Sequence, residues 1–244
     1  MAFLVIPRSR LPGSARFSNR KGGFIVLQVK KDASLLNVNI PYGMVEVRYP
    51  PREAWREVDF RETAERELSA LRERYAFYDR KAAFGENPYV RFFKKFKKTY
   101  PVLLQFESVV CKGHPFPFEN YVTAVPFLLE MTAQVLSGTH DADCIEGGLT
   151  LFLSGEKLPF TGLRGAEAHT YPGDFCARDN GGLVFSEIAG VEIRSRARPD
   201  SRHVFYPVFG TPDMPEDVVG EATERLVSYI RILAPGAEIE TAIL

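Results

Sequence analysis

The stretch Leu149-Thr150-Leu151-Phe152-Leu153 decides the fold class, because the hydrophobic pattern of the chain changes there. Upstream, apolar residues recur every three or four positions over long segments, which is the spacing of helices packed on a core. Downstream, short apolar runs are separated by turn sequences such as Asn180-Gly181-Gly182, which are typical of hairpins. The sequence therefore predicts an α+β fold with a strand-rich second half and a closing helix.

The individual elements follow from these periodicities and from capping and turn residues. Asp59 with Glu62 has the form of a capping box, Asn87-Pro88 starts a further helix, and Gly138 ends the helix before the strand-rich half. The expected helices cover residues 59–78, 88–98, 101–111, 119–136 and 215–233. The expected strands cover residues 24–29, 45–49, 149–153, 175–178, 183–188 and 204–209.

Composition and charge limit the possible classes of protein. Hydrophobic residues make up 45% of the 244 residues and charged residues 25%, as in an ordinary soluble globular protein. The 31 basic and 31 acidic side chains balance, so contact with nucleic acid would need a local basic patch. The apolar run in residues 1–7 is too short for a signal peptide, and no apolar stretch predicts a membrane span. Three scattered cysteines argue against disulfides or structural zinc and favour a cytoplasmic protein.

One joint is predicted in the chain. The segment Phe84-Gly85-Glu86-Asn87 separates the first long helical pattern from the next. We therefore expect residues 1–86 to form an N-terminal α/β subdomain packed on the rest, and residues 87–244 to form a second domain.

Residues 139–148 carry the side chains best suited to acid–base chemistry. His140 lies there with Asp141 and Asp143, and histidine titrates nearest to neutral pH. Asp141 or Asp143 is expected to fix the tautomer of His140, as in a hydrolytic triad. The alternative is a hydrogen-bonded pair that only orders a loop. No second histidine has the spacing of a metal ligand, so no metal or other cofactor is expected.

A second candidate site is a run of cations interleaved with Phe92, Phe93 and Phe96. On a helix the aromatic side chains would face the core and the cations would face outward, where they can contact a phosphate backbone. The alternative is a solvated face that only aids solubility. The cations of this basic segment are Arg91, Lys94, Lys95, Lys97 and Lys98.

Several short motifs occur in order between residues 88 and 234. They are residues 107–113, 120–122, 138–143, 145–148, 172–174, 179, 190–192 and 203–206. In this order and spacing they resemble the tRNA-editing (B-three/B-four) domain of the phenylalanyl-tRNA synthetase β-subunit, and more closely its free-standing relatives. The resemblance implies helices packed on a β-sandwich-like core, with residues 87–244 as an editing-like, tRNA-binding domain.

The resemblance also implies an activity and a site. In the synthetase, this module hydrolyses the ester of a mischarged amino acid from the tRNA end. By the resemblance, Asn120 and His140 line the pocket for the terminal adenosine and the ester, and Gly190 forms part of the wall against the amino acid. The remaining residues that the resemblance assigns to substrate binding are Lys112, Gly147 and Glu192. Backbone amides near Gly147 or Gly190 could hold a developing oxyanion.

Two departures from the family pattern affect substrate choice. The segment between Asn120 and His140 is far longer than in the synthetase, and the spacing from His140 to Ile145-Glu146-Gly147 is two residues shorter. The position of the acidic residue that recognises tyrosine in the synthetase falls near Pro207, which cannot do so. An amino acid other than tyrosine is therefore expected.

Three functions follow from these observations. The first is a deacylase that acts in trans on mischarged aminoacyl-tRNA and binds the aminoacylated 3′ end, away from any membrane. His140 would then activate a water, or only position the ester while a ribose hydroxyl of the tRNA assists. The second is a non-catalytic tRNA-binding module with the same fold. The third is a small-molecule hydrolase, which would not need the basic segment.

Overall fold

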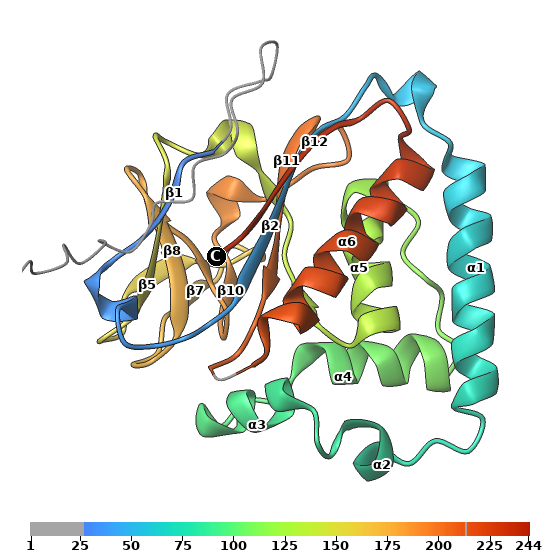
Figure 1. The fold of residues 1–244 in the computed structure, drawn as a ribbon, viewed down its shortest axis with the longest axis horizontal. Helices are drawn as coiled ribbons and strands as arrows, with labels where there is room; N and C mark the ends of the chain where they lie inside the picture. Colours follow the sequence, from blue (N-terminus) through green and yellow to red (C-terminus); the bar gives the residue numbers. More distant parts are fainter. Residues whose placement is uncertain (1–26, 213) are drawn as a thin grey trace, which may run out of the picture.

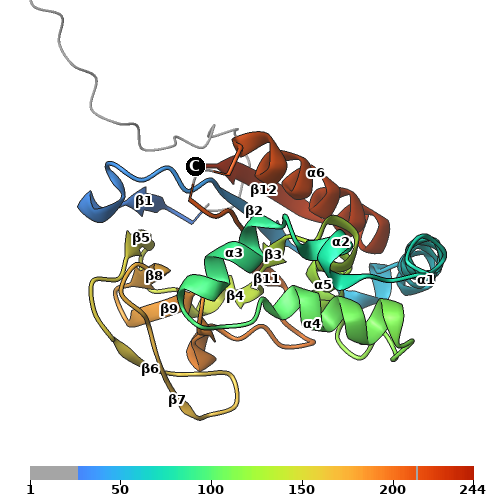
Figure 2. The same cartoon turned by 90° about the horizontal axis from the view of Figure 1, so that it is seen from below.

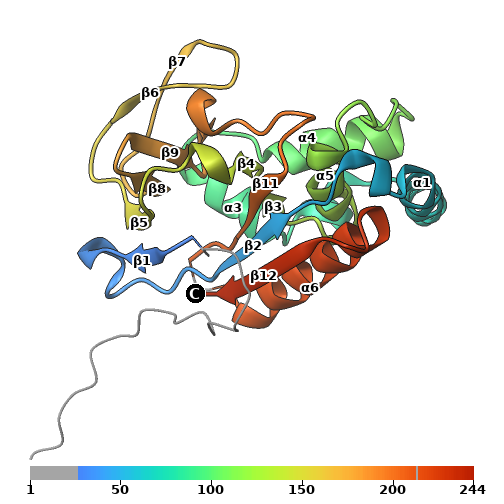
Figure 3. The same ribbon diagram turned by 90° about the horizontal axis from the view of Figure 1, so that it is seen from above.

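The fold is built on two sheets that run through most of the chain. The computed structural model describes residues 27–212 and 214–244. The first sheet has the order β1 (Val29–Lys31), β5 (Leu149–Leu153), β8 (Phe175–Asp179), β9 (Gly182–Ser186) and β10 (Gly190–Val191). The second has the order β12 (Glu238–Ile243), β2 (Tyr42–Arg48), β11 (His203–Phe209) and β3 (Leu136–Ser137), with β4 (His140–Asp141) also paired to β11. A separate hairpin joins β6 (Pro159–Thr161) to β7 (Glu167–His169) and extends away from both sheets (Figure 3).

Aromatic side chains hold the two sheets face to face. The Tyr42 ring of β2 lies 5.7 Å from Phe175 of β8 and 6.2 Å from Phe185 of β9, measured between ring centroids. Phe209 of β11 meets Phe185 edge-on at 5.0 Å. The Tyr42–Phe185 pair is stacked, whereas the other two contacts are tilted or edge-on, and such offset and edge-on contacts are favoured between packed aromatic rings. The layer between the sheets is therefore a buried aromatic core.

Helices cover the other face of the second sheet. Figure 1 shows α5 (Tyr121–Ala133) and α6 (Glu216–Leu233) against this sheet and α1 (Glu57–Arg74) outside them. The shorter helices α2 (Arg80–Phe84), α3 (Pro88–Lys95) and α4 (Pro101–Phe106) lie at the lower end of the molecule in that view, with a π-helical turn, η3 (Glu107–Cys111), after α4. Four 3-10 turns complete the described elements: η1 (Ala33–Leu35), η2 (Arg52–Ala54), η4 (Ala142–Cys144) and η5 (Ile193–Ser195).

The predicted α+β class is confirmed, and most predicted helices exist with altered ends. Helix α1 begins at Glu57, so Asp59 lies in its first turn instead of capping it. Helix α5 ends at Ala133 and not at Gly138, and its C-cap Gln134 adopts the left-handed conformation (φ 54°). The Gln134 carbonyl accepts hydrogen bonds from Asn87 and Tyr100, and these tertiary contacts stabilise a conformation that glycine usually supplies.

Several strands were not predicted, because their partners are distant in the sequence. β3, β4 and β12 are short or half-polar and exist through pairing with β11 or β2. The strand expected over residues 24–29 is instead β1, which begins at Val29; residues 24–26 lie outside the described residues.

The predicted joint does not separate two sheets. β2 pairs with β11 from Tyr42 to Arg48 and with β12 from Gly43 to Arg48, and β1 pairs in parallel with β5. A boundary after residue 86 would therefore divide both sheets.

In the described part of the chain, no helix combines the length and apolar character needed to cross a membrane.

Gly43 of β2 provides a test of the packing between the second sheet and α6. A Cβ atom at Gly43 would overlap Thr223 Oγ1 and lie 3.0 Å from Val219 Cγ1, both on α6. We expect Gly43→Ala to lower the free energy of unfolding by about 1–3 kcal/mol, the usual cost of overpacking. Urea denaturation measures this change.

Gly220 of α6 is the matched control, because a Cβ atom there meets nothing within 4 Å. Gly220→Ala should raise the free energy of unfolding by up to about 1 kcal/mol through helix propensity. Adding Thr223→Ala to Gly43→Ala should restore part of the lost stability. Equal effects of Gly43→Ala and Gly220→Ala would contradict the close packing of β2 on α6.

Candidate functional site

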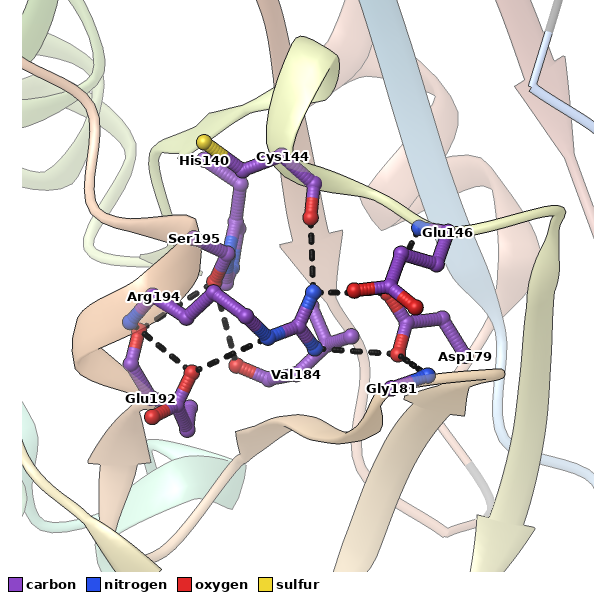
Figure 4. A network of polar contacts seen from close by, with 9 residues as sticks. All are labelled: His140, Cys144, Glu146, Asp179, Gly181, Val184, Glu192, Arg194 and Ser195. Carbon is purple, nitrogen blue, oxygen red and sulfur yellow. Dashed lines mark hydrogen bonds and ion pairs between the residues drawn. The ribbon is translucent and has the colours of Figure 1, made fainter.

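Arg194 fastens the segment after β4 to the first sheet (Figure 4). Its guanidinium donates to both carboxylate oxygens of Asp179, at 3.0 and 2.9 Å, and to the carbonyl of Cys144 at 2.6 Å. Asp179 also accepts the backbone N–H groups of Glu146 and Gly181, each at 2.8 Å. We call these contacts the Arg194 network. They hold η5 against the segment that contains Cys144, which lies 50 residues earlier in the sequence.

The Arg194 network keeps a buried carboxylate ionised. The Asp179 side chain has no exposed surface, and burial by itself would raise its pKa. Hydrogen bonds from Arg194 and from the two backbone amides outweigh burial, so the pKa of Asp179 lies below its usual value. A charged pair with this many donors is a structural anchor.

His140 lies inside the molecule, between the two sheets. Its ring is fully buried and stacks on Phe205 of β11, with centroids 4.5 Å apart and planes 7° from parallel. Nδ1 lies 3.0 Å from Ser195 Oγ, and Nε2 has no hydrogen-bond partner among the described residues. Burial lowers the pKa of His140 to about 3, so the imidazole is neutral at pH 7.

The carboxylates beside His140 in the sequence do not contact it, contrary to the expected triad. In β4, successive side chains point to opposite faces, so Asp141 turns away from His140. Asp141 accepts hydrogen bonds from Ser201 Oγ at 2.6 Å and from the Asp143 amide at 3.1 Å. The group that fixes the orientation of His140 is Ser195, whose Oγ also approaches the Glu192 carbonyl at 3.2 Å.

Asp143 contacts a different histidine, His203. Its Oδ1 lies 2.7 Å from His203 Nδ1, and His203 Nε2 lies 2.8 Å from Glu46 Oε1. Burial alone would lower the pKa of His203, but its two carboxylate partners raise the pKa overall. The sequence analysis missed this group, because the pairing of β11 with β2 brings Glu46 to His203, and the pairing of β11 with β4 brings Asp143 there.

Ser195 was also missed, because its contact with His140 joins residues 55 positions apart in the sequence. Residues 193–195 form the 3-10 turn η5, so Arg194, Arg196 and Arg198 do not share one face as they would on an extended strand. Arg194 is committed to Asp179, while Arg196 and Arg198 are exposed.

A pocket opens beside the end of β3, with a volume of about 250 Å³. Gly138 and Gly190 line it on opposite sheets, together with Phe185 and Phe209. A Cβ atom at Gly138 would lie 3.4 Å from His140 Nε2, so the imidazole is directly behind this part of the wall. Gly190 has φ +102°, and a Cβ atom there would meet nothing within 4 Å, so its missing side chain leaves the pocket open.

Of the residues expected to bind substrate, Gly190 lines this pocket and the others have local structural roles. Asn120 caps α5 by accepting the Val122 amide at 3.1 Å, and Lys112 follows η3 on the surface. Gly147 (φ +84°) lies against Asn180, and Glu192 caps η5 by accepting the Arg194 amide at 2.8 Å.

The basic segment has the expected orientation. Phe92 and Phe93 are buried, whereas all five cations are exposed. Arg91 pairs with Glu86 at 3.2 Å, and Lys98 Nζ lies 5.4 Å from the centre of the Tyr171 ring. Helix α3 lies below the ends of the sheets in Figure 1 and in front of them in Figure 2.

The basic segment leads directly to the pocket. Pro101, three residues after Lys98, is one of the lining residues. Tyr89 of α3 donates a hydrogen bond to the carbonyl of Phe209, another lining residue. Among the described residues, no group of three or more His, Cys, Asp or Glu side chains is placed to hold a metal ion.

Comparisons with known proteins find similarity to solved structures alone. No family model matches the chain, and no curated protein sequence matches it. It is similar to the crystal structure of an N-terminal fragment of the phenylalanyl-tRNA synthetase β-subunit from Pyrococcus horikoshii, with 14% identity and a TM-score of 0.44. The match covers 86% of this chain and 49% of that one, so this chain spans about half the length of the fragment. The resemblance to the editing domain stays a prediction.

The Arg194 network predicts a large effect of one substitution. Arg194→Gln leaves the buried Asp179 carboxylate without its counter-charge, and should lower the free energy of unfolding by about 3 kcal/mol. Arg56→Gln is the control, since Arg56 and its partner Asp59 are both largely exposed at 3.8 Å and should contribute less than about 1 kcal/mol. Urea denaturation of both variants measures the two losses in the free energy of unfolding. If both losses are small and similar, the Arg194 network is not a structural anchor.

The burial of His140 predicts a pH dependence of stability. Between its unfolded pKa of 6.5 and its folded pKa of about 3, the unfolded chain binds a proton that the folded protein does not. The free energy of unfolding therefore falls as pH falls through this range, by up to about 1.4 kcal/mol per pH unit from this group. His140→Gln removes the titration and should flatten the dependence.

The pH dependence of stability is compared between the parent protein and His140→Gln, because Asp174 changes stability with pH in the opposite direction to His140. Burial raises its pKa from 3.8 to about 6, so Asp174 favours folding as pH falls. This contribution is the same in both proteins and cancels in the difference. Parallel stability curves for the parent protein and His140→Gln would contradict a neutral, buried His140.

Proposed function

We propose that the protein is an aminoacyl-tRNA deacylase that acts in trans. The observation that carries the proposal is the exposed basic segment joined to a pocket walled by Gly138 and Gly190. Clustered cations bind a phosphate backbone without reading its sequence, which suits contact with an acceptor stem. The pocket, whose lining residue Pro101 is three residues after Lys98 in the sequence, would then bind the acylated end of the tRNA.

Hydrolysis of an aminoacyl ester does not require a strong acid or base from the protein side chains. An aminoacyl ester is already activated, so a site that positions the ester and a water accelerates its hydrolysis. His140 is neutral and buried behind Gly138, which supports a positioning role and not that of a general base in contact with water. We propose that a ribose hydroxyl of the tRNA assists the attack, with the backbone near Gly190 available to the developing oxyanion.

A second candidate is a non-catalytic module that binds the tRNA end. It is favoured by the lining of the pocket, in which Glu187 is the only ionisable residue among those described. A binding module needs the cations and the pocket but no acid or base. The two candidates differ in one measurable property, the release of the amino acid.

The test is a deacylation panel with tRNAs that carry cognate and non-cognate amino acids. We expect release from at least one mischarged pair, and a loss of at least tenfold in the double variant Lys94→Glu/Lys95→Glu. Because log affinity for nucleic acid changes with log salt by about 0.9 for each phosphate contact, removing two contacts should reduce that slope by about two.

The control is Arg66→Glu/Arg74→Glu, which reverses two exposed cations on α1 and changes the net charge equally. It should leave deacylation within about twofold, since charge reversal far from a bound backbone is screened by salt. Binding of tRNA without release from any pair would favour the non-catalytic module. Hydrolysis of small esters that is unaffected by Lys94→Glu/Lys95→Glu would favour a small-molecule hydrolase.

A further inference from the structure

Glu187 is the one ionisable residue of the pocket, and its carboxyl group has no partner among the described residues. The residue is 5% exposed, and neither carboxylate oxygen has a hydrogen bond in that part of the chain. The Glu187 amide donates to the Phe175 carbonyl at 2.9 Å, which continues the ladder between β8 and β9 by one residue. With alternating side chains, Glu187 lies on the same face as Phe185, which also lines the pocket.

The surroundings of Glu187 are rich in acceptors and poor in free donors. The nearby Tyr89 hydroxyl donates to the Phe209 carbonyl, and the Tyr100 hydroxyl donates to the Gln134 carbonyl at 3.0 Å. The charge that acts on Glu187 is that of Asp174, which has the same sign. An unpaired carboxyl in such a place is costly, so it is a candidate ligand-binding group.

Apart from Ser137 and Ser186, whose hydroxyls donate to Glu130 and Asp174, the other residues that line the pocket have apolar side chains or are glycines. Its walls include Pro101, Leu136, Phe185, Ile188 and Phe209. A fitting ligand therefore combines an apolar body with a strong hydrogen-bond donor, and a positive charge on the donor would balance the carboxylate. A primary ammonium group beside an aliphatic side chain meets both requirements.

We propose that Glu187 binds the α-ammonium group of the amino acid in the pocket, so that the site accepts aminoacyl groups with a free amine and rejects N-acylated ones. This inference rests on the proposed function for its biological substrate, but not for its test. Glu187 would be a substrate-binding residue that selects the state of the amine, while the apolar walls hold the side chain.

Binding would be coupled to release of a proton. Burial, with a smaller effect of Asp174, holds the pKa of Glu187 well above its ordinary value, so this carboxyl group keeps its proton to higher pH than an exposed glutamate does. An ammonium ligand requires the ionised form. Apparent affinity should therefore rise as pH rises, by up to tenfold per unit, until the amine of the ligand itself loses its proton.

The test uses leucinamide and N-acetyl-leucinamide, which share a side chain and differ in the charge of the amine. Isothermal titration calorimetry with the full chain should show leucinamide binding at least tenfold tighter than N-acetyl-leucinamide. It should also show release of protons to the buffer, because an ammonium ligand favours the ionised carboxylate. Glu187→Gln should weaken leucinamide at least tenfold and abolish the pH dependence of its affinity.

The matched control is Glu167→Gln, an exposed glutamate of β7 that does not line the pocket. It should bind leucinamide as the parent protein does. Thermal unfolding of Glu187→Gln is measured beside it, and an unchanged melting temperature shows that the substitution is tolerated. Equal affinity for the two ligands, or unchanged leucinamide binding by a folded Glu187→Gln protein, would overturn the inference.

The same design separates this inference from the proposed function. Leucinamide carries no ester and needs no tRNA, so its binding by Glu187 can be observed whether or not the protein is a deacylase. Deacylation that proceeds equally on leucyl-tRNA and N-acetyl-leucyl-tRNA would reject the role of Glu187 while leaving the deacylase proposal standing.

Discussion

The ion pair between Arg194 and Asp179 is the interaction on which the arrangement of the candidate site depends. It joins η5 to the turn between β8 and β9, and through the Cys144 carbonyl it also holds the segment after β4. Asp179 is wholly buried and ionised, a state that persists because the guanidinium and two amides supply its hydrogen bonds. Ser195 follows Arg194 directly, so the same anchor fixes the hydroxyl that orients His140.

This arrangement assigns different roles to two histidines. His140 is neutral and stacked on Phe205, which suits a wall element behind Gly138. His203 lies between Glu46 and Asp143, and these carboxylates raise the pKa of the imidazole that links the second sheet to η4. In the proposed function the protein would position the ester, a hydroxyl of the substrate would assist the reaction, and the basic segment would bind the phosphate backbone.

The chain shows how far local patterns extend. The amphipathic pattern correctly placed Phe92 and Phe93 inside and the cations outside, since a helix face is set by sequence spacing. The helix is shorter than the predicted 88–98, because α3 ends at Lys95 and Lys97 adopts a positive φ. The prediction that Asp141 contacts His140 was wrong, because neighbouring side chains on a strand point to opposite faces. The positive φ of Gln134 was not visible in the sequence, since its stability comes from Asn87 and Tyr100.

The amino-acid sequence by itself determined the α+β class, the main helices and the exposed basic segment, because these depend on periodicities of three to seven residues. Only the tertiary structure decided which groups meet in the pocket. Gly138 and Gly190 come from different sheets, and Glu187 faces them only because β9 packs against β11 through Phe185 and Phe209. Long-range pairing of this kind is set by the burial of aromatic faces, which leaves no local pattern in the chain.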